Sequence, residues 1–214
     1  MQQAFSFAKK PAEAAEAGSA VVEYDFPKDP AKANSIVLVG EAPGAEETRL
    51  RHPFVGRSGQ LLDKILEKSG IERKQCLVAN VFRVQPPGNK VDHFFISARA
   101  AKQQGIGIAE SYGKFGSAFC RATFAPEIEH LRATLQTYRK KQGKIVVVAL
   151  GRTPLWALTG KNGLLDKVGQ PLPCSLAPGL TVIPTFHPSF ILRGNWALQD
   201  EWHRHLSAAK KFVS

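Results

Sequence analysis

Four short runs of Val, Ile, Leu and Ala recur along the chain without alternating polar positions. They lie at residues 35–39, 77–81, 145–150 and 180–185. Strands that are buried on both faces of a parallel sheet have this continuous apolar pattern, whereas strands with one face in water alternate. The pattern therefore predicts four strands of a parallel sheet.

Helical patterns separate these runs. Residues 59–69 place their apolar side chains on one face, and Gly70 follows as a stop signal. Residues 126–141 carry an apolar stripe and end in basic side chains, which interact favourably with the helix dipole. A short helix near Pro154 and a C-terminal helix over residues 200–213 complete the series. The alternation predicts a three-layer α/β/α sandwich around a central, mostly four-stranded parallel sheet.

Length and composition indicate one globular domain behind an N-terminal arm. The 214 residues suffice for one well-buried α/β domain and are too few for two. We expect residues 1–30, which include an Ala- and Glu-rich stretch, to form a loosely ordered arm, and residues 31–214 to form a single domain. No apolar run approaches the roughly 20 residues that span a bilayer, and the N-terminus lacks the apolar segment of a signal peptide.

The formal net charge of +11 and the isoelectric point near 9.8 suit a polyanionic partner. The basic side chains are dispersed, as on a folded surface that follows phosphates, so charge alone leaves nucleic acid and other partners open. The three cysteines, Cys76, Cys120 and Cys174, include no C-x-x-C pair. Their odd number argues against a disulfide framework and fits a reducing cytoplasm.

Each predicted strand runs directly into an unusual loop. The four loops read GEAPG, NVFRVQPPGN, LGRTP and TFHPSF. Because the carboxyl ends of parallel strands meet at one edge of a sheet, we expect Glu41, Asn80 and His187 to converge there. Neither a G-x-G-x-x-G nor a G-x-x-x-x-G-K-[ST] pattern marks these loops, so a dinucleotide site and a phosphate-binding loop are weakly supported.

The first loop and the segment after it contain residues with two open interpretations. Glu41 either sits in water beside a tight turn or acts as an anionic neighbour of a developing cation. Phe54, between a proline and a glycine-flanked helix start, is poorly placed for a core and well placed to stack on a planar base. The helix start near Ser58 either uses this side chain as a cap or also binds a DNA phosphate.

Later loops leave similar alternatives. Asn80 either satisfies local backbone groups or offers an amide donor and acceptor to the edge of a pyrimidine. His187 is fixed by Pro188 and is expected to point into the crevice. The loop that follows either packs on its own core or pushes an apolar wedge into stacked bases and holds a phosphate; it comprises Ser189, Phe190, Ile191, Leu192 and Arg193. His203 and His205 lie two positions apart on a predicted helix and so do not share a face, and no carboxylate completes a His-based site at useful spacing. No metal site is therefore predicted.

The ordered motifs GEAPGAEE…PFVGRSGQLL, ANVFRVQPPGN, VVVALG and TFHPSFILR resemble the uracil-DNA glycosylase superfamily. The nearest branch looks like the bacterial and archaeal family 4 enzymes, and the resemblance covers roughly residues 35–89 and 145–193. It implies a cytoplasmic, monomeric base-excision-repair enzyme that flips uracil out of single- or double-stranded DNA and hydrolyses its N-glycosidic bond. A protein that binds uracil-containing or abasic DNA with little turnover, or traps it covalently, is the alternative.

The resemblance also implies which residues act on the bond. Gly40 and Glu41 would lie beside the glycosidic bond, where Glu41 orders water or stabilises positive charge. His187 would donate a hydrogen bond to uracil O2 as the bond breaks. Cleavage of the bond produces an oxocarbenium-like sugar and a uracil anion. A carboxylate can stabilise the cationic sugar, and a hydrogen-bond donor can stabilise the anionic base.

For the base and the DNA, the resemblance implies further contacts. Phe54 would stack on the flipped base, Asn80 would read its Watson–Crick edge, and Glu47 would lie near the pocket. The loop 189–193 would probe the DNA. Ala42 stands where the best-studied uracil-specific enzymes carry an aspartate, which leaves other deaminated bases open as substrates.

Two departures from the family 4 pattern accompany the match. Those enzymes hold an iron–sulfur cluster with four cysteines, one of them at the position of Val84, and the N-terminal C-x-x-C is absent here. We therefore expect no cluster and no other cofactor.

The connection over about residues 90–121 is longer than usual and either supplies structural support or lies on DNA. In a related branch, an insertion in this region carries a histidine that traps the abasic sugar, and His93 lies in the same connection here. That branch's basic signature is missing, so a monofunctional glycosylase is expected.

Overall fold

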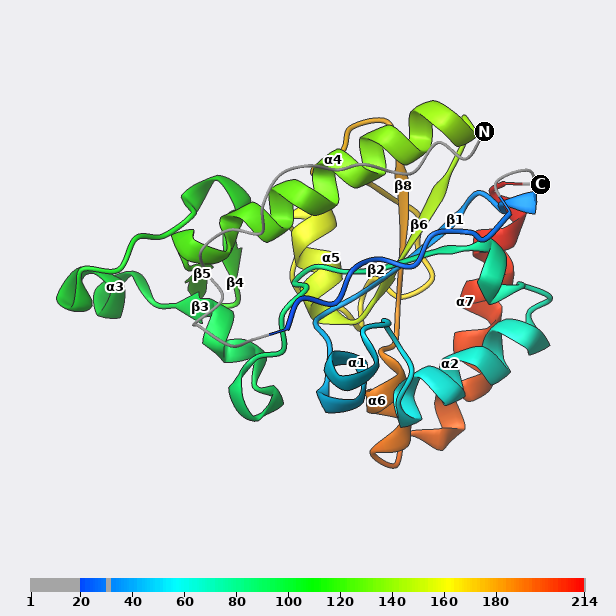
Figure 1. Cartoon of the computed structure of the whole chain (residues 1–214), viewed down its shortest axis with the longest axis horizontal. Coiled ribbons are helices and arrows are strands. Elements are labelled where there is room, and N and C mark those ends of the chain that lie inside the picture. Colours follow the sequence, from blue (N-terminus) through cyan, green and yellow to red (C-terminus); the bar gives the residue numbers. More distant parts are fainter. Residues whose placement is uncertain (1–19, 30–31, 214) are drawn as a thin grey trace.

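The central sheet contains five strands in the order β2-β1-β6-β8-β7 (Figure 1). The structure is a computed structural model that describes residues 20–29 and 32–213. The parallel strands are β1 (Ile36–Gly40), β2 (Leu77–Asn80), β6 (Val146–Leu150) and β8 (Thr181–Thr185). The short β7 (Leu172–Pro173) pairs antiparallel with β8. All four expected strands are confirmed to within a residue at each end, whereas β7 is too short to leave a pattern in the sequence.

Helices cover both faces of this sheet, as expected for a three-layer sandwich. On one face, Ile36 and Leu38 of β1 share an apolar cluster with α2 (Arg57–Lys68) and α7 (Gln199–Lys211). On the other face, Val37 and Val39 share a second cluster with α4 (Ala125–Gln142) and α5 (Arg152–Thr159). Successive strand residues point to opposite faces, so continuous apolar strands require both clusters.

Shorter elements complete the fold. These are α1 (Ala45–Leu50), α3 (Ala98–Gln104), α6 (Pro188–Leu192) and the 3-10 turns Arg73–Gln75, Pro87–Asn89, Val91–Phe94, Glu110–Tyr112, Ala122–Phe124 and Trp196–Leu198. Within the described residues, none of the helices has the length and apolar character needed to cross a membrane.

The long connection over about residues 90–121, called the insertion from here on, forms its own small antiparallel sheet in the order β3-β5-β4. Its strands are β3 (Phe95–Ile96), β4 (Lys114–Phe115) and β5 (Ala118–Cys120). Aromatic rings join it to the main domain: Phe94 stacks on Phe82 with ring centroids 3.9 Å apart. Phe95 contacts Trp156 of α5 edge-on at 5.1 Å. The insertion therefore extends the apolar cluster under α4 and α5, beside the central sheet (Figure 1).

The expected boundary of the N-terminal arm at residue 30 is wrong for residues 20–29. Val22 is 1% exposed and its N–H donates to the carbonyl of Arg83 at 2.8 Å. Asp25 forms a β-bridge with Val78 of β2. This segment is held by backbone pairing, which a composition-based boundary does not detect. The expectation for residues 1–19 lies outside the described residues.

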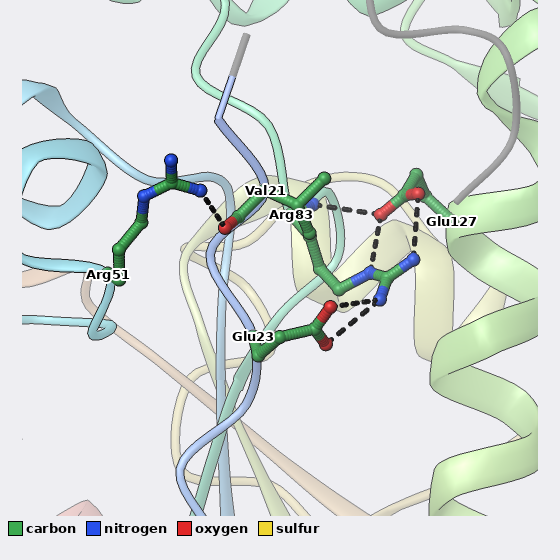
Figure 2. Close-up of polar contacts among 5 residues, drawn as sticks. All are labelled: Val21, Glu23, Arg51, Arg83 and Glu127. Atoms are coloured by element: carbon green, nitrogen blue, oxygen red, sulfur yellow. Dashed lines mark hydrogen bonds and ion pairs between the residues drawn. The ribbon is translucent and has the colours of Figure 1, made fainter. Parts of the chain in front are cut away.

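A buried ion pair between Arg83 and Glu127, to which the more exposed Glu23 adds, fixes the same segment (Figure 2). The guanidinium of Arg83 donates to both carboxylate oxygens of Glu127, at 2.9 and 3.1 Å, and to Glu23 at 3.0 Å. The backbone N–H of Arg83 also donates to Glu127. On the other side of the segment, Arg51 donates to the carbonyl of Val21 at 3.1 Å. Arg83 thus joins the N-terminal segment, the loop after β2 and α4 next to the position of Val84.

Candidate active site

A hollow of about 450 Å³ lies where the loops after β1, β2 and β8 meet. The expected convergence of Glu41, Asn80 and His187 is confirmed, because all three side chains line it. The parallel register explains the approach of the first two, since it pairs Gly40 with Asn80. The hollow brings together the following residues selected from the sequence: Glu41, Ala42, Glu47, Phe54, Ser58, Asn80, His187, Ser189 and Arg193.

The inner wall of the hollow is closely packed around Gly40. A Cβ atom on Gly40 would lie 2.4 Å from Asn80 Oδ1 and 2.4 Å from Phe54 Cζ, so only glycine fits there. Asn80 is 3% exposed. Phe54 is 6% exposed and belongs to the core cluster under α2, which corrects the expectation that it is poorly placed for a core. Its ring also faces His187, with centroids 6.0 Å apart.

Glu47 connects the first loop to the segment after α1. One carboxylate oxygen accepts hydrogen bonds from the N–H groups of Val55 and Gly56, at 3.0 and 2.8 Å. The other accepts from the N–H of Gly44 at 3.1 Å. Glu47 lines the hollow as expected, but its oxygens are engaged by backbone groups. Its contribution is to hold the two loops against each other.

Glu41 receives a hydrogen bond from a residue that the sequence did not single out. Thr153 is fully buried on α5, and its hydroxyl donates to Glu41 Oε2 at 2.5 Å. Burial raises the pKa of Glu41, while this hydrogen bond and the charges of Arg152 and Arg193 act in the opposite direction. The available signal was the LGRTP loop itself, since Thr153 lies three residues after β6 at the same edge.

His187 is held in one tautomer by the helix that it caps. Its Nδ1 accepts the backbone N–H of Ser189 at 3.1 Å and lies 2.7 Å from the Ser189 hydroxyl. Because a backbone N–H can only donate, Nδ1 carries no proton and the neutral ring is protonated on Nε2. Loss of contact with water and the nearby charge of Arg193 lower the pKa of His187 to about 4. At neutral pH the ring is an uncharged donor through Nε2.

Sequence comparisons with known proteins assign the chain to a family. The sequence model of the uracil DNA glycosylase superfamily matches residues 26–208. The chain belongs to this superfamily. The type-4 uracil-DNA glycosylase of Thermotoga maritima is 35% identical over 160 residues, which cover 74% of this chain and 66% of that protein. Those of Pyrobaculum aerophilum and Archaeoglobus fulgidus are each 44% identical over 55 residues, covering 26% of this chain and 28% of theirs. The matched part thus spans just under two thirds of the Thermotoga protein and about a quarter of the others.

The segment expected to probe DNA in this superfamily member is a short helix, α6, rather than a loop. Pro188 occupies its first turn and His187 caps it, which explains why a helix begins there. Ile191 is fully buried in the cluster under α2, so it is not a wedge available at the surface and we withdraw it as a DNA contact. Phe190 and Leu192 are partly buried, and Arg193 is exposed.

Ser58 does not cap α2. The N-cap is Gly56, without a side-chain cap, and Ser58 is the second residue of the helix. Gly59 explains the tight packing at this point, because a Cβ there would lie 1.7 Å from the carbonyl oxygen of Phe54. Ser58 lines the hollow and remains a candidate contact of the substrate.

The residues present do not fit the iron–sulfur cluster of family 4 relatives. The chain has three cysteines, and all are buried and free. Burial raises the pKa of Cys76 and of Cys120 to about 12, which disfavours the thiolates that a cluster requires. Over residues 20–29 and 32–213, no three His, Cys, Asp or Glu side chains gather where they could hold a metal. Val84, at the position of one ligand, is 7% exposed in an apolar cluster.

The tautomer and pKa of His187 can be measured directly. We expect NMR titration of the ring to give a pKa of about 4, with the proton of the neutral form on Nε2. Arg193→Gln removes the nearby positive charge, so the pKa should rise. A His187 pKa near the ordinary value of about 6.5, unchanged by Arg193→Gln, would contradict this geometry.

Proposed function

We propose that the chain is a monofunctional DNA glycosylase that hydrolyses the N-glycosidic bond of uracil in DNA and leaves an abasic site. The observation that carries the proposal is the meeting of Asn80, Glu41 and His187 around one hollow at the carboxyl edge of the sheet. Membership of the superfamily and the similarity to three type-4 uracil-DNA glycosylases support the same activity.

Recognition of the base uses the inner wall of the hollow. The Asn80 amide can accept from uracil N3–H and donate to O4, which together define the pyrimidine edge. The Phe54 ring provides an apolar surface for the planar base, and Gly40 leaves room for the Phe54 and Asn80 side chains to pack at the inner wall. A base can reach these groups only after it has left the DNA stack, so we propose that uracil is flipped into the hollow.

Bond cleavage separates charge between the sugar and the base. The C1′–N1 electron pair leaves with uracil, whose O2 becomes more negative and accepts from the Nε2–H of His187. The sugar becomes cationic beside the Glu41 carboxylate. Water then adds to C1′ and loses one proton, which Glu41 accepts and passes to the uracil anion. The products are uracil and an abasic sugar, and both side chains return to their starting states.

Glu41 performs this role only when it is ionised. Burial raises its pKa, and the Thr153 hydroxyl is the first of the interactions that oppose burial. We propose that Thr153 is a positioning residue, which fixes the carboxylate and favours its charged form. His187 needs no such partner, because partial burial favours its neutral form.

The substrate and setting follow from the charge and the relatives. Arg57, Arg152 and Arg193 are exposed beside the hollow, and the formal net charge is +11, so DNA phosphates are favoured. The relatives come from bacteria and archaea, where DNA lies in the cytoplasm. We propose a cytoplasmic monomer that acts on single- or double-stranded DNA without an iron–sulfur cluster or another cofactor.

The direct test is release of free uracil from a uracil-containing oligonucleotide in the presence of EDTA. We expect release by the wild-type chain, and a loss on the order of a thousandfold in rate for Asn80→Ala or His187→Ala, because each removes a contact to the reacting base. DNA affinity should change little in both variants. Tight DNA binding without any release of uracil would overturn the proposal, and full activity of Asn80→Ala would remove its assigned role.

Oligonucleotides with hypoxanthine or xanthine measure the selectivity of the pocket.

The positioning role of Thr153 is tested by the pH profile. Thr153→Val keeps the shape and removes the donor, so the pKa of Glu41 should rise and the acidic limb of kcat/KM should move to higher pH. A hydrogen bond to a charged group is worth about 1.5–3 kcal/mol, so the rate on the acidic limb should fall by roughly ten- to a hundredfold. Thr153→Ser should restore the profile. The role would be contradicted if Thr153→Val left the acidic limb of kcat/KM unchanged. It would also be contradicted if Thr153→Val lowered the rate as much in a Glu41→Gln variant as in the wild-type chain.

A further inference from the structure

A second hollow adjoins the first. It has a volume of about 660 Å³ and shares Glu41, His187, Ser189 and Arg193 with the base pocket. Its remaining walls come from Gly151 and Arg152 at the start of α5, from Phe190 of α6 and from the loop after α5. The two residues assigned to bond cleavage therefore lie at the junction of two hollows, only one of which is needed for the uracil base.

The loop after α5 exposes an apolar side chain beside this second hollow. Leu165 is 67% exposed, more than the two other exposed large hydrophobic residues of the described chain, Trp196 at 48% and Leu50 at 44%. Leu164 next to it is partly buried and also lines the hollow. A single exposed leucine does not by itself indicate a binding site. Leu165, however, lines a hollow that also contains Glu41 and His187, so it can contact a ligand bound there.

Hydrogen bonds fix this loop at both ends. At one end, the Asn162 amide accepts from the N–H of Gly116 and donates to the carbonyl of Lys114, both at 2.9 Å. At the other end, the N–H of Gly169 donates to the carbonyl of Pro184 in β8 at 2.8 Å. Leu165 lies between these anchors, so its exposure belongs to a held turn.

The insertion also holds an arginine at this hollow. The guanidinium of Arg152 lies 5.3 Å from the ring centroid of Phe115, which is a cation–π distance. Phe115 belongs to β4, between the two residues that bind Asn162. One hairpin of the insertion thus positions both the charged and the apolar wall of the second hollow.

We propose that the second hollow binds the nucleotide adjacent to the uracil in the same strand, which rests on the proposed glycosylase function. When the uracil sugar lies at Glu41 and His187, the next phosphate and base follow within one nucleotide step of a few ångströms. Arg152 and Arg193 suit the phosphate, and Leu165 and Phe190 suit the face of the neighbouring base, whatever its identity. Asp166 also lines the hollow, and its negative charge disfavours a phosphate beside it, so the phosphate is assigned to the part of the wall formed by the two arginines.

The test compares KM on single-stranded oligonucleotides that differ only beside the uracil. One has normal nucleotides on both sides, and two others carry a tetrahydrofuran abasic analogue on the 5′ or the 3′ side. We expect Leu165→Ala to raise KM about tenfold on the normal oligonucleotide with kcat unchanged, as for the loss of one base contact. On one of the two abasic-neighbour substrates, Leu165→Ala and wild type should have the same KM.

Two variants complete the test. Asn162→Ala releases the loop from the insertion and should reproduce the KM effect of Leu165→Ala on the same substrates. Leu50→Ala, an exposed leucine outside both hollows, should match wild type throughout. An equal KM for wild type and Leu165→Ala on normal DNA, or an increase that is the same on all three substrates, would overturn the subsite. Absence of uracil release by the wild-type chain would instead refute the proposed function.

Discussion

The candidate site depends on one constraint, the parallel pairing of β1, β2, β6 and β8. Parallel strands deliver all their carboxyl ends to one edge, and the register pairs Gly40 with Asn80 and Leu150 with Thr185. The loops that follow therefore meet without any contact between distant segments having to be built separately. Glycine at position 40 completes the constraint, because a side chain there would occupy the space between Asn80 and Phe54.

Low access to water has opposite consequences for the two groups assigned to bond cleavage. It disfavours charge on both, so it raises the pKa of Glu41 and lowers that of His187. In the proposed mechanism, His187 acts as a neutral imidazole that donates through Nε2, whereas Glu41 acts as the anion. For Glu41, the Thr153 hydroxyl and two nearby arginines oppose the effect of burial on the pKa. One fold thus supports an uncharged donor beside a carboxylate whose charged form is favoured by a hydroxyl and two arginines.

The sequence predicted the strands, the layers and the convergence of Glu41, Asn80 and His187, because continuous apolar runs and strand-end loops are local signals. It did not predict the hydrogen bond from Thr153 to Glu41, because these residues lie 112 positions apart in the chain. Ile191 was misplaced for a related reason: a short apolar run does not reveal whether its side chains face the core or the solvent. The pairing of residues 20–29 with β2 and the sheet of the insertion depend on tertiary contacts and aromatic packing, which composition does not show.

The most direct measurement of the central claim is a crystal structure of the chain with free uracil. The account predicts that uracil lies in the hollow between Phe54 and Asn80, with N3–H and O4 on the Asn80 amide and O2 within hydrogen-bonding distance of His187 Nε2. Ordered uracil elsewhere on the protein, with the hollow holding only solvent, would contradict it. So would a base in the hollow that leaves Asn80 and His187 without contact to it.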